Sequence, residues 1–149
     1  QLEIFSTRIT EIDENLTPTG YYIDVKDTPF DFRIGKLIGK DINCDDEQLK
    51  FGNGFDHNFV IDNDIAAILS CDNLRMIVRT SLPGMQVYTG NYLNEYTNKD
   101  GFTFKMHGGV ALETQSFPDA INHDNFPNVV LNKGEKYHSE TSYNFEVIK

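Results

Sequence analysis

Turn-forming residues interrupt this sequence so often that no segment of useful length keeps the 3.6-residue hydrophobic period of an amphipathic helix. The turn signals, spread along the whole chain, are Pro18–Gly20, Asn53–Gly54, Asp72–Asn73, Pro83–Gly84, Lys99–Gly101, Gly108–Gly109 and Lys133–Gly134. Gly, Pro, Asn and Asp favour backbone conformations that end regular elements. Short alternating runs lie between these signals, among them Leu74–Thr80 and Thr141–Ile148. This pattern predicts an all-β fold, an antiparallel sandwich or barrel of many short strands.

Length and charge restrict the possible partners. The chain has 149 residues, and 13 Lys and Arg against 23 Asp and Glu give a net charge of 13 − 23 = −10. The length fits one compact domain or a part of a larger one. We expect no nucleic-acid partner and no membrane partner, because both surfaces are anionic and require clustered Lys and Arg. The hydrophobic runs are also too short to cross a bilayer.

The segment Gly54–Ile61 alternates between two faces of a predicted strand. Phe55, His57 and the next alternate apolar positions share one face, which we expect to lie against the core. His57 is then interpreted as a packing residue rather than a ligand. Asp56 and Asn58 point to the other side. The Asp56 carboxylate either caps a turn or anchors a polar ligand in a cleft, and its position alone favours capping.

A second segment, Pro83–Leu93, places Gln86, Tyr88 and Gly90 on one side of a strand. A glutamine and a tyrosine beside a glycine suit the close approach of a small polar ligand. An edge strand with a bulge at Gly90 is an equally good interpretation.

A third segment, Gly108–Phe117, places Ala111, Glu113 and Gln115 on the face opposite to Leu112. Partial burial would raise the pKa of the Glu113 carboxyl and make it a better general base near neutral pH. The alternative is an exposed strand residue that points outward.

Sequence signatures of other chemistries are absent. The chain has no nucleophile elbow and no glycine-rich phosphate loop. No metal ligand set is expected, since the four histidines lack metal-binding spacing, and no cofactor is expected either. These histidines are His57, His107, His123 and His138.

Taken together, these segments resemble the C-terminal part of aldose 1-epimerases, also called galactose mutarotases. The matching stretches occur in the family's order: Asp13–Gly20, Thr28–Arg33, Ile38–Ile42, Asn53–Phe59, Pro83–Leu93, Leu112–Pro127 and Lys133–Phe145. The last stretch departs from the family pattern, because His138-Ser139-Glu140-Thr141 stands where the family has His-Thr-Thr.

The resemblance implies a large antiparallel β-sandwich that interconverts the α and β anomers of hexoses such as galactose and glucose. Residues 1–149 would then be roughly the C-terminal half of a single aldose 1-epimerase domain. The family's general base falls on Glu113, its sugar-binding aspartate on Asp56, and its pocket glutamine on Gln86; Tyr88 lies beside that glutamine. These residue types suit the chemistry, since anomerisation needs only proton transfers and a well-positioned sugar.

The family's general acid is a histidine in an Asn-His-x-x-Phe-Asn motif, which this chain does not contain. The expected partners are therefore a hexose substrate and an N-terminal half of the same protein that supplies this histidine. Residues 1–149 alone are expected to be inactive. The alternative is a non-catalytic carbohydrate-binding module of the same fold. The acidic composition is compatible with a cytoplasmic enzyme that acts on neutral sugars.

Overall fold

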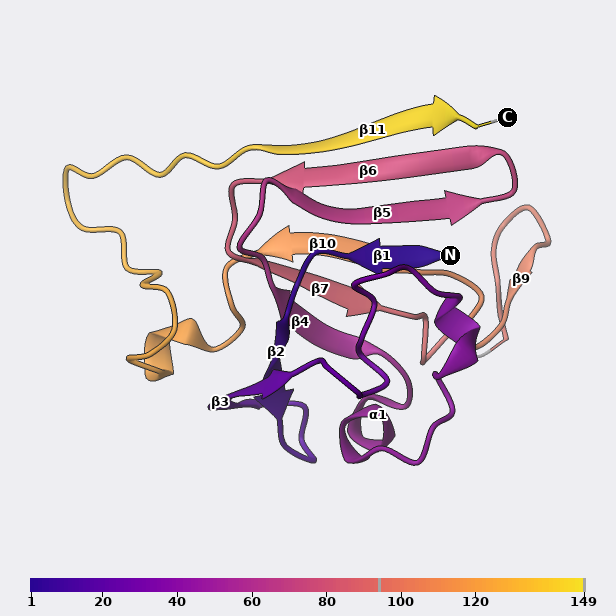
Figure 1. The fold of residues 1–149 in the computed structure, drawn as a ribbon, viewed down its shortest axis with the longest axis horizontal. Coiled ribbons are helices and arrows are strands. Elements are labelled where there is room, and N and C mark those ends of the chain that lie inside the picture. Colours follow the sequence, from indigo (N-terminus) through magenta and orange to yellow (C-terminus); the bar gives the residue numbers. More distant parts are fainter. Residues whose placement is uncertain (94, 149) are drawn as a thin grey trace.

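Two antiparallel β-sheets and one short two-stranded ribbon form the fold seen in the computed structural model, which describes residues 1–93 and 95–148 (Figure 1). The four-stranded sheet has the order β1-β5-β6-β11, and the five-stranded sheet has the order β10-β7-β4-β2-β3. The ribbon pairs β8 with β9. Every strand pair is antiparallel, so the all-β prediction is confirmed.

The strands of the four-stranded sheet are β1 (Leu2–Ile4), β5 (Ile65–Cys71), β6 (Leu74–Thr80) and β11 (Thr141–Val147). The strands of the five-stranded sheet are β2 (Arg8–Ile12), β3 (Pro18–Asp24), β4 (Asp56–Val60), β7 (Gly84–Tyr88) and β10 (Ala111–Gln115). The ribbon consists of β8 (Tyr96–Thr97) and β9 (Thr103–Phe104). The helical elements are η1 (Ile38–Lys40), α1 (Glu47–Gly52) and η2 (Ala120–Asn122).

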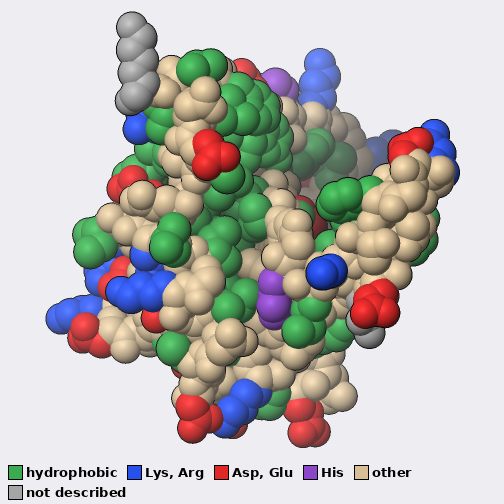
Figure 2. Space-filling model, turned by 90° about the vertical axis from the view of Figure 1, so that its right-hand side faces the viewer, with side chains coloured by type: hydrophobic (Ala, Val, Ile, Leu, Met, Phe, Trp, Pro, Cys, Tyr) green, Lys and Arg blue, Asp and Glu red, His purple; other side chains and the backbone are tan. Residues whose placement is uncertain are grey.

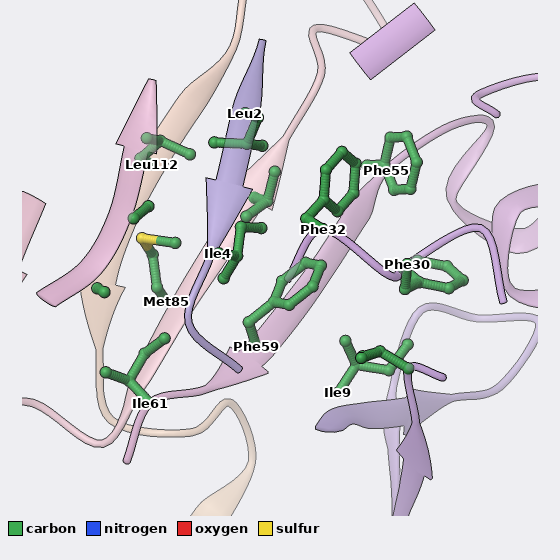
Figure 3. Close-up of a cluster of buried hydrophobic side chains, with 14 of the residues drawn as sticks. Leu2, Ile4, Ile9, Phe30, Phe32, Phe55, Phe59, Ile61, Met85 and Leu112 are labelled. Atoms are coloured by element: carbon green, nitrogen blue, oxygen red, sulfur yellow. The ribbon is translucent and has the colours of Figure 1, made fainter. Parts of the chain in front are cut away.

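The core lies between the two sheets, as Figure 3 shows. Leu2 and Ile4 of β1 meet Phe59 of β4 and Met85 of β7, and all four side chains are at most 1% exposed. The segment between β3 and α1 adds two further phenylalanines. Phe30 packs edge to face on Phe55 at a centroid distance of 5.4 Å, and Phe32 packs on it at 5.2 Å. Aromatic burial of this kind contributes strongly to a small core.

The short helix α1 was not expected from the sequence, in which no segment of useful length keeps a helical period. Asp46 begins the helix, because its carboxylate accepts a hydrogen bond from the backbone N–H of Leu49 at 3.1 Å. Asn53 ends it in the left-handed conformation, with φ of 53°. The two caps allow a helix of only 6 residues, which is too short for a periodic signal.

The interpretation of Pro83–Leu93 as an edge strand is wrong. Strand β7 lies inside the five-stranded sheet and is paired on both sides, with β4 and with β10. Gly90 follows the end of β7 with φ of 65°, and it therefore belongs to the turn after the strand rather than to a bulge. Across residues 1–93 and 95–148, no helix has the length and hydrophobicity needed to cross a membrane.

Candidate sugar site

Three neighbouring strands, β4, β7 and β10, carry the candidate site on the outer face of the five-stranded sheet. Antiparallel pairing places Asp56 opposite Tyr88 and Gln86 opposite Glu113. The intervening residues point the other way into the core, where Phe55, for example, is fully buried. The alternation expected from the sequence is therefore confirmed, and it puts the polar residues of all three strands on one face.

These residues surround an open pocket of about 460 Å³. Its lining consists of Asp56, Gln86, Tyr88, Tyr92, Glu113, Gln115 and Pro118. All four residues singled out from the sequence therefore lie around one pocket, although they come from three separate segments of the chain. The lining combines two carboxylates, two amides and two phenol groups, and the described part of it contains no Lys or Arg.

The Asp56 carboxylate and the Gln86 amide form the most direct polar contact in the pocket. Gln86 Nε2 donates a hydrogen bond to Asp56 Oδ1 at 2.7 Å. Both side chains are partly buried. The carboxylate thus faces the neighbouring strand and its pocket, which does not support the turn-capping interpretation of Asp56.

Tyr88 connects the pocket to the turn that follows β7. Its hydroxyl oxygen accepts a hydrogen bond from the backbone N–H of Tyr92 at 3.1 Å. The Tyr92 side chain is 59% exposed and adds a second aromatic ring to the lining. Aromatic faces with a polar edge suit ligands that present both C–H and O–H groups.

Glu113 lies in the middle of β10, and its side chain is exposed. The partial burial considered for it in the sequence is not provided by the described residues. Its placement beside Gln86 and on the same face as Asp56 nevertheless puts the two carboxylates around one opening.

His57 lies on the opposite face from this pocket, fully buried in the core, as expected for a packing histidine. Burial lowers the pKa of its imidazole from 6.5 to about 3, so the ring is neutral at pH 7. Its Nδ1 atom accepts a hydrogen bond from the backbone N–H of Asp56 at 3.1 Å, which places the proton on Nε2. The ring also packs edge to face on Phe30, 4.6 Å between centroids. His57 therefore supports the backbone at Asp56 from the core side.

Three further residues lie at or near the pocket: Tyr92, Gln115 and Asn58. The spacing of two placed Gln115 on the strand face of Glu113 and Asn58 on the strand face of Asp56, but neither was assigned to the site from the sequence. Tyr92 lies after the end of β7, where no strand period applies.

The two sheets and this pocket define a β-sandwich that presents a polar, carboxylate-bearing site on the outer face of one sheet. Comparison with known proteins narrows the class. The family model for aldose 1-epimerase matches residues 1–144. The chain is 39% identical over 143 residues to the galactose mutarotases of Bos taurus and Homo sapiens, and this match covers 91% of the chain. It is 33% identical to the aldose 1-epimerase of Escherichia coli K12, over 97% of the chain. The chain belongs to the aldose 1-epimerase family.

Solved structures agree with this assignment. The galactose 1-epimerase of Lactobacillus acidophilus superposes with a TM-score of 0.88 and 31% identity, over 99% of this chain and 44% of its own. An aldose epimerase homologue from C. elegans superposes with a TM-score of 0.83 and 28% identity, covering 46% of that chain. The chain spans about 40% of the length of the mammalian relatives.

Proposed function

We propose that this chain forms the sugar-binding and general-base side of an aldose 1-epimerase, which interconverts the α and β anomers of hexoses such as galactose and glucose. The observation that carries the proposal is the convergence of Asp56, Gln86, Tyr88 and Glu113 around one pocket. Their side chains offer acceptors and donors for sugar hydroxyls without a cation that would favour a phosphorylated substrate. The proposed location of the protein is the cytoplasm.

In the proposed reaction, Glu113 removes the proton from the C1 hydroxyl, while a general acid protonates the ring oxygen and the bond between C1 and the ring oxygen breaks. Rotation about the C1–C2 bond and ring closure, with the two proton transfers reversed, yield the other anomer. No metal or cofactor takes part. Asp56, Gln86 and Tyr88 bind the sugar hydroxyls and hold C1 against Glu113.

The general acid in this proposal comes from an N-terminal half of the same protein, which is also the proposed partner of this chain. Among the described residues, no histidine lines the pocket. The edge strand β11 of the four-stranded sheet offers a surface for that half, on the face that is turned toward the five-stranded sheet. Tyr143 of β11 faces the five-stranded sheet, since its hydroxyl donates to the backbone oxygen of Leu112 at 3.1 Å. Phe145 follows on the same face but is 64% exposed.

The cross-strand neighbours of Phe145 extend this hydrophobic surface over β6 and β5. Phe145 pairs with Met76, which in turn pairs with Leu69, and both of these side chains pack at the margin of the core. Figure 2, which views this end of the molecule, shows hydrophobic side chains gathered in its upper half. An N-terminal half that covers this surface would remove a large hydrophobic side chain from water.

The test is the rate of mutarotation of freshly dissolved α-D-glucose, followed by polarimetry, with the longest natural polypeptide that contains this chain. Glu113→Gln should reduce kcat by about 10²-fold or more while hexose still binds, because a positioned general base contributes about 10²–10⁴-fold. A variant rate close to that of the unmodified protein would refute the role of Glu113. Residues 1–149 alone should give no rate above the uncatalysed reaction.

A second candidate function is a carbohydrate-binding module without turnover. The absence of a histidine from the described pocket lining favours it for the isolated chain. Hexose binding without any mutarotation by the longest natural polypeptide would support this alternative.

A further inference from the structure

Hydrogen bonds connect a series of amide side chains along the outer face of the five-stranded sheet, starting at the pocket. Gln115 Nε2 donates to Gln86 Oε1 at 3.3 Å and to Asn58 Oδ1 at 3.4 Å. Gln86 Nε2 in turn donates to Asp56 Oδ1. The order Asn58–Gln115–Gln86–Asp56 therefore connects a buried amide to the candidate sugar-binding carboxylate, through side chains on three adjacent strands.

The direction of this series matters because a glutamine amide has nearly the same shape after a flip that exchanges its oxygen and nitrogen. The donor from Gln115 occupies Gln86 Oε1 and thereby leaves Gln86 Nε2 to face Asp56. A flipped Gln86 would turn its oxygen toward the carboxylate, where the two acceptors repel each other. The orientation of Gln86 thus depends on what holds Gln115.

Asn58 is the buried end of this series of amides, and it accepts a hydrogen bond from Gln115. It is 2% exposed and does not line the large pocket. It lies opposite Gln86 in the strand register, and Gly84 of β7 makes room for it. A Cβ on Gly84 would overlap Asn58 Oδ1 and lie 2.9 Å from Phe117. The sheet is therefore built to accommodate the Asn58 side chain.

Asn58 also faces a second, smaller cavity of about 90 Å³, whose lining includes Thr10, Asp56 and Gln86. Within residues 1–93 and 95–148, Asn58 Nδ2 and Thr10 Oγ1 are both buried and have no hydrogen-bond partner. A polar cavity of this size has room for about three water molecules at roughly 30 Å³ each. Water in this cavity can therefore accept a hydrogen bond from Asn58 Nδ2, which has no partner among the described residues.

We propose that Asn58 is a positioning residue which, through Gln115, holds Gln86 in the orientation that donates to Asp56, and thereby pre-organises the sugar site; this presupposes the proposed sugar-binding function of Asp56 and Gln86. Asn58 does not touch the substrate. Its effect is on binding, since a pre-oriented amide reduces the ordering cost when a hexose enters.

The test compares Asn58→Leu, Gln86→Leu and the double variant in the longest natural polypeptide that contains this chain. Asn58→Leu should raise KM for hexose by about three- to tenfold, which corresponds to the loss of one ordinary hydrogen bond. The change in kcat should be smaller than the change in KM. In the Gln86→Leu background the same substitution should no longer raise KM, because residues in one network are not additive.

Thr114→Val is the matched control. Thr114 neighbours Gln115 in sequence but points to the other face, where its hydroxyl is hydrogen-bonded to that of Thr141 at 2.7 Å. This variant should alter the melting temperature without changing KM. Gln115→Met removes the amide that donates to both Asn58 and Gln86. If Asn58→Leu does not fold, KM is measured for this variant instead.

An unchanged KM in Asn58→Leu, or an equal increase in the presence and absence of Gln86, would overturn the positioning role; for Gln115→Met the same two criteria apply. A wild-type protein that neither binds nor interconverts hexoses would refute the proposed function, and the positioning role with it. A wild-type protein that does both, with independent effects of Asn58 and Gln86, would refute the positioning role alone.

Discussion

Replacing the buried His57 by glutamine should remove a large part of the acid sensitivity of folding. His57 is fully buried beneath Asp56, and burial lowers the pKa of its imidazole from 6.5 to about 3. In the unfolded chain the imidazole binds a proton below about pH 6.5. Between pH 6.5 and about 3, the unfolded state therefore binds more protons at this position than the folded state.

The sign and size of the effect follow from this difference. Stability is fully present above pH 6.5 and is lost as the pH falls toward the folded pKa. Each pH unit in this window costs about 1.4 kcal/mol, so at pH 4.5 His57 accounts for a loss of about 3 kcal/mol relative to neutral pH. Hydrogen bonds also lower the pKa values of carboxyl groups such as Asp13 and Asp31. Their protonation at lower pH therefore reduces the stability of the folded protein in the same direction.

The measurement is urea unfolding at pH 7.5 and pH 4.5, followed by circular dichroism, for the wild type and His57→Gln. We expect the difference in unfolding free energy between the two pH values to be about 3 kcal/mol smaller in the variant. His138→Gln, a substitution of an exposed histidine, is the matched control and should keep the wild-type difference. An identical pH dependence in His57→Gln and wild type would mean that burial does not depress the pKa of His57, and would refute the reasoning.

Two further expectations concern packing. Gly84→Ala should lower the unfolding free energy by about 1–3 kcal/mol, because the added Cβ meets Asn58 and Phe117; an unchanged melting temperature would contradict this contact. Phe145→Ala should cost about 3–5 kcal/mol in the longest natural polypeptide that contains this chain, if the proposed N-terminal half buries this side chain, and less than about 1 kcal/mol in residues 1–149 alone, where Phe145 is 64% exposed. Equal losses of unfolding free energy in the two proteins would refute the proposed cover over Phe145.

Strand periodicity made much of the site predictable. Asp56 was assigned to the side of its strand opposite the core, and Gln86 was assigned to the same side of its strand as Tyr88; the structure agrees with both. The reason is local: in a strand with one buried face, a spacing of two determines which side a residue occupies. The edge assignment of Pro83–Leu93 failed because whether a strand lies at an edge depends on its partners, which are distant in sequence.

The sequence by itself determined that this chain is an all-β protein, which side of each strand carries its polar residues, and, through its motifs, the family resemblance. Only the tertiary structure decided that Asn58, Gln86 and Glu113 form one row across β4, β7 and β10. It also decided that Asn58 is buried and Glu113 is exposed. The physical reason is that alternation specifies a face, whereas strand order and register arise from long-range pairing and from the packing of both sheets around one core.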